Sequence, residues 1–344
     1  MDGQYSDRAA DRRQYPSIDL WKFVFSFAVV ALHTGPLEKC EVEWVQKLYA
    51  IVTQAAVPFF FLAAGFLLGQ KLVFDAGPSG ENGRILKNYL FRIGKMYLLW
   101  SAIYLPLAVI HFILEKTPFS EAILRYLTGL VFVGEQYNSW VLWYLLSTFY
   151  AILVILLVIR KQAGFRRLLC LSLAASVLVA VFDAIGNDSS DLQGIWNTAR
   201  TGIRYLLSSG RIFNGLVYIP LGIVLSKKKA RPAVCWVLLL AGAAGQCFIG
   251  NRICRVYLLI ATAVGWFGIV REMRMPESRV YPALRSMSTT IYLIHLYLWT
   301  GYYTLVYGTK TYSADCFAAV SAASFLIAYA YWRIRQGRRM ITRK

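Results

Sequence analysis

About ten apolar runs of membrane-spanning length limit what this chain can fold into. A helix needs about 20 residues to cross the hydrocarbon core of a bilayer. Only helices satisfy their own backbone there without closing a barrel, and these runs are too long and too continuously apolar for barrel strands. We therefore predict an all-α, polytopic membrane helix bundle with about ten transmembrane helices. The runs lie near residues 18–36, 51–70, 89–114, 138–159, 167–184, 208–226, 232–250, 253–270, 284–305 and 314–332.

The composition of the 344 residues agrees with this prediction, since 58% of them are hydrophobic and only 16% are charged. A soluble domain usually carries about 25% charged residues. These values exclude a disordered chain, a disulfide scaffold and an ordinary cytosolic enzyme. The six cysteines show no CxxC or CxxH spacing, so the sequence indicates no metal site.

The net charge of +19 is attributed to membrane orientation rather than to a nucleic-acid partner. With the N-terminus in the cytoplasm, 26 of the 37 Lys and Arg residues fall on inner segments and only 9 on outer ones. This asymmetry favours an N-in, C-in topology. Residues 1–17 and 335–344 are then cytoplasmic tails, and residues 18–334 form the transmembrane domain in the plasma membrane.

Ionisable side chains within the runs are functional candidates, because a charged group at the bilayer centre costs several kcal/mol. The sequence holds only a few of them, and they include all three histidines of the chain. They are Asp19, Lys22, His33, His111, Arg211 and His295.

The first run carries Lys22 and His33 on one helical face. They are 11 residues apart, which places them about 20° apart in direction and about 16 Å apart along the axis. Asp19 lies within one turn of Lys22 and is expected to pair with it. A cation near the inner interface and an imidazole deeper in the membrane suit an anionic ligand that enters from the cytoplasm. The alternative is that Lys22 snorkels to the headgroups and that His33 is a hydrogen-bonded residue at a helix end.

Two further groups accompany this face. Trp140, Trp143, Tyr144 and Arg211 are expected at the depth of His33, although aromatic residues also form belts at membrane interfaces. The basic residues after the second run suit phosphate binding, or they reflect topology alone; they are Arg84, Lys87, Arg92 and Lys95. Gly65 and Gly69 predict close packing of the second helix.

These residues resemble the signature of the membrane acyltransferase 3 family. The resemblance rests first on Asp19-x-x-Lys22 with His33, and on Val57-Pro58-Phe59-Phe60-Phe61 through Gly65. Trp140-x-x-Trp143-Tyr144 matches as well, as do Arg211 ahead of Asn214-Gly215, Pro220-Leu221-Gly222, and Ser288 through Tyr292 to His295. The matches follow the family order over most of the chain. The membrane domain of vancomycin-resistance serine racemases, which belongs to the same superfamily, is also similar.

The resemblance implies a ten-span enzyme that moves acyl groups, often acetyl, from cytoplasmic acyl-CoA to hydroxyls of cell-envelope glycans or other surface molecules. His33 matches the catalytic histidine of the family, and Lys22 stands where many members have arginine. Arg84, Lys87 and Arg92 lie where the family has a cytoplasmic basic motif. A lysine keeps the charge of an arginine but loses its bidentate fork.

We therefore expect O-acyl transfer, such as O-acetylation, at a site within a bacterial plasma membrane. Acyl-CoA is the co-substrate, with its phosphates near Lys22, Asp19 and the basic segment, and His33 is the general base. Arg211, Trp140, Trp143, Tyr144 and His295 would position the acceptor or stabilise the oxyanion. The expected partners are membrane lipid, acyl-CoA and a hydroxyl acceptor, with no nucleic acid and no metal. The rival function is a transporter of a small polar substrate such as an amino acid, and a membrane scaffold is a third, weaker alternative.

Overall fold

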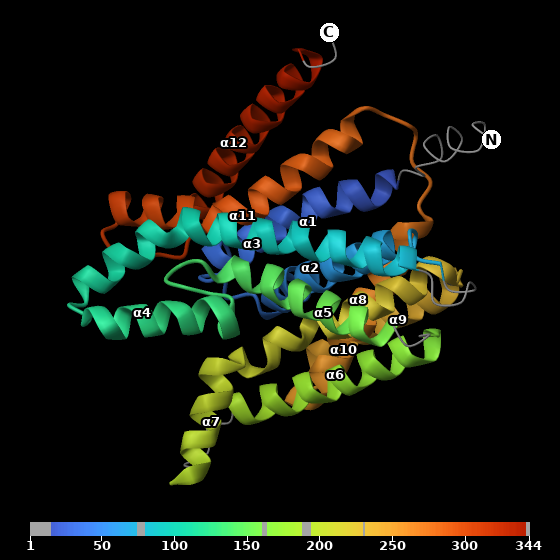
Figure 1. The fold of residues 1–344 in the computed structure, drawn as a ribbon, viewed down its shortest axis with the longest axis horizontal. Coiled ribbons are helices and arrows are strands. Elements are labelled where there is room, and N and C mark those ends of the chain that lie inside the picture. The colour runs from blue at the N-terminus through green and yellow to red at the C-terminus, as the bar shows by residue number, and fades with distance from the viewer. Residues whose placement is uncertain (1–14, 74–79, 160–163, 188–193, 230, 342–344) are drawn as a thin grey trace.

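The protein is a bundle of helices in the computed structural model, which describes residues 15–73, 80–159, 164–187, 194–229 and 231–341. The described residues contain twelve α-helices and no strand, and Figure 1 shows how the helices are arranged. The all-α prediction is therefore confirmed. The helices are α1 (Pro16–Thr34), α2 (Glu43–Gly69), α3 (Gly80–Leu114), α4 (Phe119–Thr128), α5 (Trp143–Ile159), α6 (Phe165–Gly186), α7 (Ile195–Leu206), α8 (Asn214–Lys227), α9 (Pro232–Phe248), α10 (Arg252–Glu272), α11 (Val280–Val306) and α12 (Ala314–Ile341).

All ten apolar runs lie on helices, and α4 and α7 are additional. Among the described residues, seven helices are long and apolar enough to cross a membrane, or eight if the bent pair of α7 and α8 is one span. The seven are α1, α2, α3, α5 with its leading turn, α6, α10 and α12. Helix α9 is apolar but has only 17 residues. Helix α11 has 27 residues and mixes its apolar side chains with many hydroxyl groups. The N-in, C-in orientation stays a prediction.

Apolar side chains cover much of the outer surface of the bundle. Leu98, Leu99, Ile110 and Ile113 of α3 are each more than half exposed. A soluble protein rarely leaves so large an apolar surface uncovered. Lipid is the environment that this surface fits.

Three short segments connect the helices near the candidate site. A π-helical turn (Gly129–Val133) follows α4, a 3-10 turn (Trp140–Leu142) leads into α5, and a 3-10 segment (Ser208–Phe213) leads into α8. These segments are labelled η2, η3 and η4. The 3-10 turn η3 places Trp140 at the start of α5, and η4 places Arg211 at the start of α8.

Helix α1 begins and ends where its sequence dictates. Pro16 occupies the first turn, where its missing N–H is not needed. Gly35 ends the helix in the left-handed conformation, with φ 57°, and its N–H donates to the carbonyl of Ala31. His33 therefore lies in the last turn of α1.

The core of the bundle forms where α1, α2 and α10 meet. Phe25, Phe59 and Phe267 are each about 1% exposed or less, and the ring of Phe59 contacts those of the other two. Trp21 and Trp266 extend this aromatic cluster, with ring centroids 5.5 Å apart. Helix α11 packs against both α1 and α12, and this arrangement leaves one face of α1 directed at α11.

Helices α2 and α8 approach each other closely through glycine. A Cβ atom at Gly65 would lie 2.2 Å from the carbonyl oxygen of Ile219, and one at Gly69 would lie 2.3 Å from Oγ of Ser226. At Gly222, on α8, a Cβ atom would lie 2.3 Å from the carbonyl oxygen of Leu62. The predicted close packing of the second helix is confirmed, because only glycine leaves room for the facing backbone.

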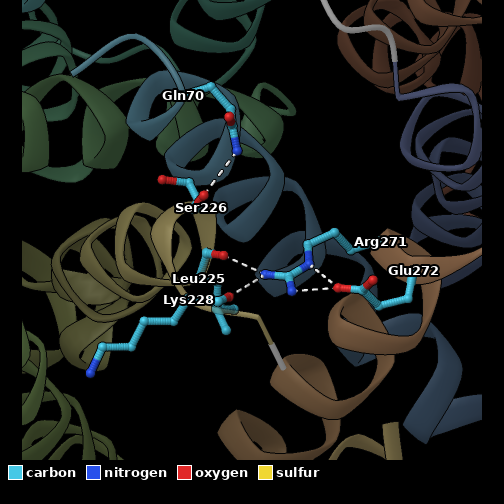
Figure 2. A network of polar contacts seen from close by, with 6 residues as sticks. All are labelled: Gln70, Leu225, Ser226, Lys228, Arg271 and Glu272. Carbon is cyan, nitrogen blue, oxygen red and sulfur yellow. Dashed lines mark hydrogen bonds and ion pairs between the residues drawn. The ribbon is translucent and has the colours of Figure 1, made fainter. Parts of the chain in front are cut away.

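The C-terminal end of α8 is held by side chains from two other helices (Figure 2). Arg271, at the end of α10, donates to the carbonyls of Leu225 and Lys228, the latter at 3.0 Å, and pairs with Glu272. Gln70, just after α2, donates to the carbonyl of Ser226 at 3.0 Å. These donors satisfy carbonyls that a helix end leaves without partners.

The terminal segments of the domain prediction are only partly described. Residues 1–14 and 342–344 lie outside the described residues, and α1 begins at Pro16. Helix α12 continues to Ile341, so it runs from the last apolar run into the basic segment 335–341.

Candidate functional site

The face of α1 that carries Lys22 and His33 is directed at α11. His33 lies beside His295 of α11, with ring centroids 5.4 Å apart. At the other end of the helix, the charges of Asp19, Arg285 and Arg92 act on Lys22. We call the Lys22 end of α1 the inner end and the His33 end the outer end, following the predicted orientation. One stripe of α1 thus joins two polar clusters inside the bundle.

Asp19 pairs with Arg285 of α11 rather than with Lys22. Nε of Arg285 lies 2.8 Å from one carboxylate oxygen of Asp19, and Nη2 lies 2.6 Å from the other. The expected pairing with Lys22 is therefore wrong. A planar guanidinium can contact both oxygens at once, whereas an ammonium group contacts them as a point charge. Lys22 is half-buried, and the charge of Asp19 acts on it although the carboxylate forms its ion pair with Arg285.

Arg285 is a residue of the inner end that the sequence interpretation assigned only to topology. Its side chain is 47% exposed, while that of Asp19 is 3% exposed. The pair therefore joins a buried carboxylate to a cation that still faces outward from the bundle.

Helix α3 carries four basic residues, Arg84, Lys87, Arg92 and Lys95, and among them Arg92 is the one that acts on Lys22. Arg92 packs over the ring of Tyr89, with 4.8 Å from its guanidinium carbon to the ring centroid, and its charge acts on Lys22. Arg84 and Lys87 are exposed on the preceding turns of α3. Arg92 therefore acts with Arg285 on Lys22, although Arg92 is exposed like Arg84 and Lys87.

The outer end is built from rings. His33 is half-buried, and its ring centroid lies 5.8 Å from that of Trp140 and 5.4 Å from that of His295. Trp140 in turn contacts Trp299 of α11, with centroids 6.2 Å apart. A half-buried imidazole among aromatic rings is protected from bulk water and keeps access to a small reactant.

His295 is fully buried, with 0% exposure. Its Nδ1 lies 2.8 Å from the carbonyl oxygen of Tyr292 and 3.2 Å from that of Ile291. A carbonyl only accepts hydrogen bonds, so Nδ1 must carry the proton. Nε2 is then a bare acceptor, and it has no hydrogen-bond partner among the described residues.

Lys310 belongs to the outer end and was missed by sequence reasoning, which counted it as a loop cation. Its Nζ lies 4.1 Å from the ring centroid of Trp140 and 5.2 Å from that of Trp299. The charges of Lys310 and Arg211 both act on His33. A lone lysine in a short connection gives no signal of this placement, because the two tryptophans come from distant segments.

The loop that presents Trp140 is fastened to α11 by hydrogen bonds. Asn138, buried and in the left-handed conformation with φ 51°, donates to Thr300 at 3.0 Å and to Tyr303 at 2.5 Å. These bonds hold the start of η3 against the helix that carries His295. The position of Trp140 beside His33 therefore depends on Asn138.

Arg211 borders a cleft of about 990 Å³ between the outer ends of several helices. Its Nη2 lies 3.5 Å from a carboxylate oxygen of Glu135, and its guanidinium carbon lies 5.6 Å from the ring centroid of Trp143. Burial raises the pKa of the Glu135 carboxyl, and the charge of Arg211 opposes this rise. Gln136, Asp183, Arg204 and Tyr205 also line the cleft.

Tyr144 is half-buried like Trp140 and Trp143, but its ring contacts other residues. Its ring packs on Phe61 and Tyr292, with centroid distances of 4.5 and 5.5 Å. Its hydroxyl donates to the carbonyl of Phe60 at 3.5 Å. Tyr144 therefore packs beside α11 without direct contact with His33.

His111 is placed apart from the His33 cluster. It stacks on Tyr137 with centroids 4.0 Å apart, and its Nε2 lies 3.3 Å from a carboxylate oxygen of Glu115. The described residues contain no group of three or more His, Cys, Asp or Glu side chains that could hold a metal ion.

Comparisons with known proteins add to this geometry. Two amino-acid racemases of Enterococcus faecalis are similar to parts of the chain, at 30% identity over 149 residues and 29% over 128 residues. These matches cover 43% and 37% of this chain but only 20% and 17% of the racemases. No solved structure matches the chain. The model of the acyltransferase 3 family, described as an acyltransferase domain, matches residues 15–333, which is nearly the whole chain. The chain therefore belongs to the acyltransferase 3 family of membrane acyltransferases.

Proposed function

We propose that this membrane acyltransferase moves an acyl group, in the simplest case acetyl, from cytoplasmic acyl-CoA to a hydroxyl of an envelope glycan or another surface molecule in a bacterial plasma membrane. The observation that carries the proposal is the stripe of α1. It joins the Lys22, Arg92 and Arg285 cations at the inner end to His33, His295 and Trp140 at the outer end.

The inner end supports binding of the CoA phosphates. Lys22 is half-buried, and the charges of Arg92 and Arg285 act on it. Arg285 is half-exposed although it pairs with Asp19. Phosphate oxygens form charge-assisted hydrogen bonds with such groups. Arg84 and Lys87 are exposed one or two turns away on α3 and would attract the same anion over a longer range.

The outer end supports the transfer step. Lys22 and His33 are about 16 Å apart along α1, so an extended pantetheine arm that follows the stripe would bring the thioester to His33. His33, neutral at rest, takes the proton of the acceptor hydroxyl as general base. The oxygen then attacks the acyl carbonyl, and the departing CoA sulfur takes the proton back from His33.

Two cations and a tryptophan support this chemistry from the surrounding segments. The charges of Arg211 and Lys310 reach the His33 ring, so either can stabilise negative charge that develops on the acyl oxygen. Trp140 packs beside His33 and would limit access of water. Arg211 also borders the outer cleft, which is the side from which a surface acceptor would arrive.

The test uses inverted membrane vesicles, which expose their cytoplasmic face, from cells that make the chain. Acetyl-CoA with a labelled acetyl group is added, and CoA release and label transfer to envelope material are followed, with mass spectrometry of the product. We expect both signals to rise together and to depend on the chain. His111→Ala is the matched control, because this histidine lies outside the His33 cluster, and it is expected to keep both signals.

Transport of a small polar substrate is the alternative outcome of the same experiment. Two partial relatives are named amino-acid racemases, so serine and other amino acids are the substrates to test. Uptake of an amino acid that proceeds without acyl-CoA, in vesicles that release no CoA, would overturn the acyltransferase proposal.

A further inference from the structure

Nε2 of His295 is a buried hydrogen-bond acceptor that has no partner among the residues the structure describes. The ring is 0% exposed, and Nδ1 already bonds to the carbonyl of Tyr292 at 2.8 Å. An unsatisfied buried polar atom costs about 1–3 kcal/mol. A buried unsatisfied atom in a native structure calls for an explanation. Because His295 lies beside the proposed reaction site, we look for that explanation in the reaction.

Three hydroxyl groups on α11 or packed against it already donate to backbone carbonyls. Tyr292 donates to the carbonyl of Val141 at 3.2 Å, and Tyr104 donates to that of Leu293 at 2.9 Å. Thr300 donates to the carbonyl of Leu296 at 2.8 Å. These three hydroxyls are therefore not free to donate to Nε2, and a donor can instead come from a group that moves toward it.

His33 is such a group. Its ring centroid lies 5.4 Å from that of His295, and the two rings are inclined by 32°. His33 is half-buried, so its ring has room to rotate about the side-chain bonds. Nε2 of His295 is closed to solvent. The adjacent ring of His33 is therefore better placed to donate to it than a bulky reactant is.

We propose that His295 is a positioning residue for His33: its Nε2 accepts the ring N–H of His33 during acyl transfer and so fixes which nitrogen of His33 is the base. This inference rests on the proposed function. The backbone carbonyl of Tyr292 fixes the tautomer of His295, and His295 in turn fixes the tautomer of His33. The remaining nitrogen of His33 is left bare and directed at the acceptor hydroxyl.

His33 is the only residue that gains and then loses a proton in the proposed step. The acceptor proton moves to the bare nitrogen of His33, which becomes an imidazolium while its second N–H stays bonded to Nε2 of His295. The C–O bond to the acyl group forms, the C–S bond breaks, and the CoA sulfur recovers the proton from His33. His295 keeps its own proton on Nδ1 throughout.

The charges around His33 give this bond a specific purpose. The groups that act on His33 are His295 from α11, Arg211 from η4 and Lys310 from the connection between α11 and α12. Two of these three are cations, which disfavour a positive charge on His33. His295 stabilises the imidazolium only in the proposed bond, where its neutral ring accepts the N–H of His33, much as a buried partner does for the base of a hydrolase triad.

The experiment compares His295→Phe, which removes the acceptor, with His295→Gln, whose amide oxygen can replace it. CoA release from acetyl-CoA is measured in the vesicles described above. We expect His295→Phe to lower kcat about 100-fold while KM for acetyl-CoA stays within about twofold, since losing a partner that orients a reacting group costs 10–100-fold. The kcat of His295→Gln should be at least about tenfold higher than that of His295→Phe. Equal activity of the two variants, or a change in KM alone, would overturn the inference.

A double variant shows whether His295 acts through His33. Adding His295→Phe to His33→Ala should change the residual rate by less than twofold, because the partner of the bond is already gone. A further large loss would assign His295 another role. The proposed function itself fails if the wild-type chain releases no CoA, and the inference alone fails if His33→Ala is inactive while His295→Phe is fully active.

A measurement on the wild-type chain covers the case in which His295→Phe does not fold. The chain has only three histidines, so ¹⁵N spectra of histidine-labelled protein can be assigned with His33→Ala and His111→Ala. We expect His295 to carry its proton on Nδ1 over the whole pH range of activity. A proton on Nε2 would overturn the inference, because that nitrogen could no longer accept.

Discussion

The two ends of α1 differ in whether the buried polar atoms beside them have hydrogen-bond partners. At the inner end a buried carboxylate, Asp19, accepts from Nε and Nη2 of Arg285 at 2.8 and 2.6 Å, and the charge of a second arginine, Arg92, acts on Lys22. At the outer end the buried polar atom is Nε2 of His295, and it has no partner among the described residues. The buried carboxylate of the inner end thus has its hydrogen-bond partners, whereas the buried nitrogen of the outer end has none among these residues.

The difference suits a division of work. Charged groups that are already paired and partly exposed can hold an anion without rearranging. The free Nε2 of His295, among aromatic rings, can accept a hydrogen bond from the ring of His33. Such a bond would orient His33 as the general base. Substitutions at His33, Arg285, Lys22 and Lys310 test this division, and their expected effects decrease in that order.

Replacing the base should have the largest effect. We expect His33→Ala to lower CoA release from acetyl-CoA by about 10³-fold, the middle of the range for loss of a general base, and to leave binding of acetyl-CoA within about twofold. The rate is measured in vesicles, and binding is measured on purified protein by calorimetry. Lost binding with unchanged turnover of bound substrate would reverse the roles assigned to the two ends.

Removing Arg285 should destabilise the inner end, because it leaves the Asp19 carboxylate buried and unpaired. We expect Arg285→Ala to cost about 2 kcal/mol of stability, less than the ~3–5 kcal/mol for a fully buried pair, because Arg285 is half-exposed. The thermal unfolding midpoint of the protein in detergent measures this loss. The double variant Asp19→Asn with Arg285→Gln removes both charges and should recover most of it. A single variant as stable as the wild type would show that the pair has no structural role.

Lys22 should act on binding rather than on the chemical step. We expect Lys22→Ala to raise KM for acetyl-CoA about tenfold, the value of one charge-assisted hydrogen bond, with kcat nearly unchanged. Lys22→Arg should keep or lower KM. Lys47→Ala is a matched control, because Lys47 pairs with Glu43 on α2 and should leave KM unchanged. A fall in kcat with constant KM would contradict the division between the two ends.

The smallest effect is expected at Lys310. Replacing it by Gln removes the cation from the faces of Trp140 and Trp299, which is worth about 0.5–1 kcal/mol at an exposed site. The unfolding midpoint should fall slightly, whereas Lys310→Arg should leave it unchanged. If Lys310→Gln and Lys310→Arg unfold at the same temperature, the stacking contributes nothing measurable to the outer end.

Sequence reasoning predicted the helices because the bilayer fixes their length. Each apolar run became a helix, and Gly65 and Gly69 predicted the close packing of α2, though not its partner α8, because small residues let membrane helices approach. It did not predict the additional helices α4 and α7, whose lengths of 10 and 12 residues are below membrane-spanning length. Their mixed polar and apolar sequences gave no run to count.

The candidate site was predictable in its residue types and less so in its pairings. The spacing of Lys22 and His33 places both on one face, and the structure directs that face at α11. The pairing of Asp19 with Arg285 joins residues 266 positions apart, so the near neighbour Lys22 was the only partner that spacing could suggest. For the same reason Lys310 was counted only as a loop charge. The bare nitrogen of His295 depends on the local path of the α11 backbone, which no residue pattern reveals.

The glycine contacts between α2 and α8 restrict how this protein can move. With Gly65 against the carbonyl of Ile219 and Gly222 against that of Leu62, a shift of either helix along the other would drive backbone into backbone. The two helices therefore travel together, and Arg271 ties their inner ends to α10 as well. Any opening that admits a large substrate has to separate other helices of the bundle, and a two-halved rocking motion cannot use the boundary between α2 and α8.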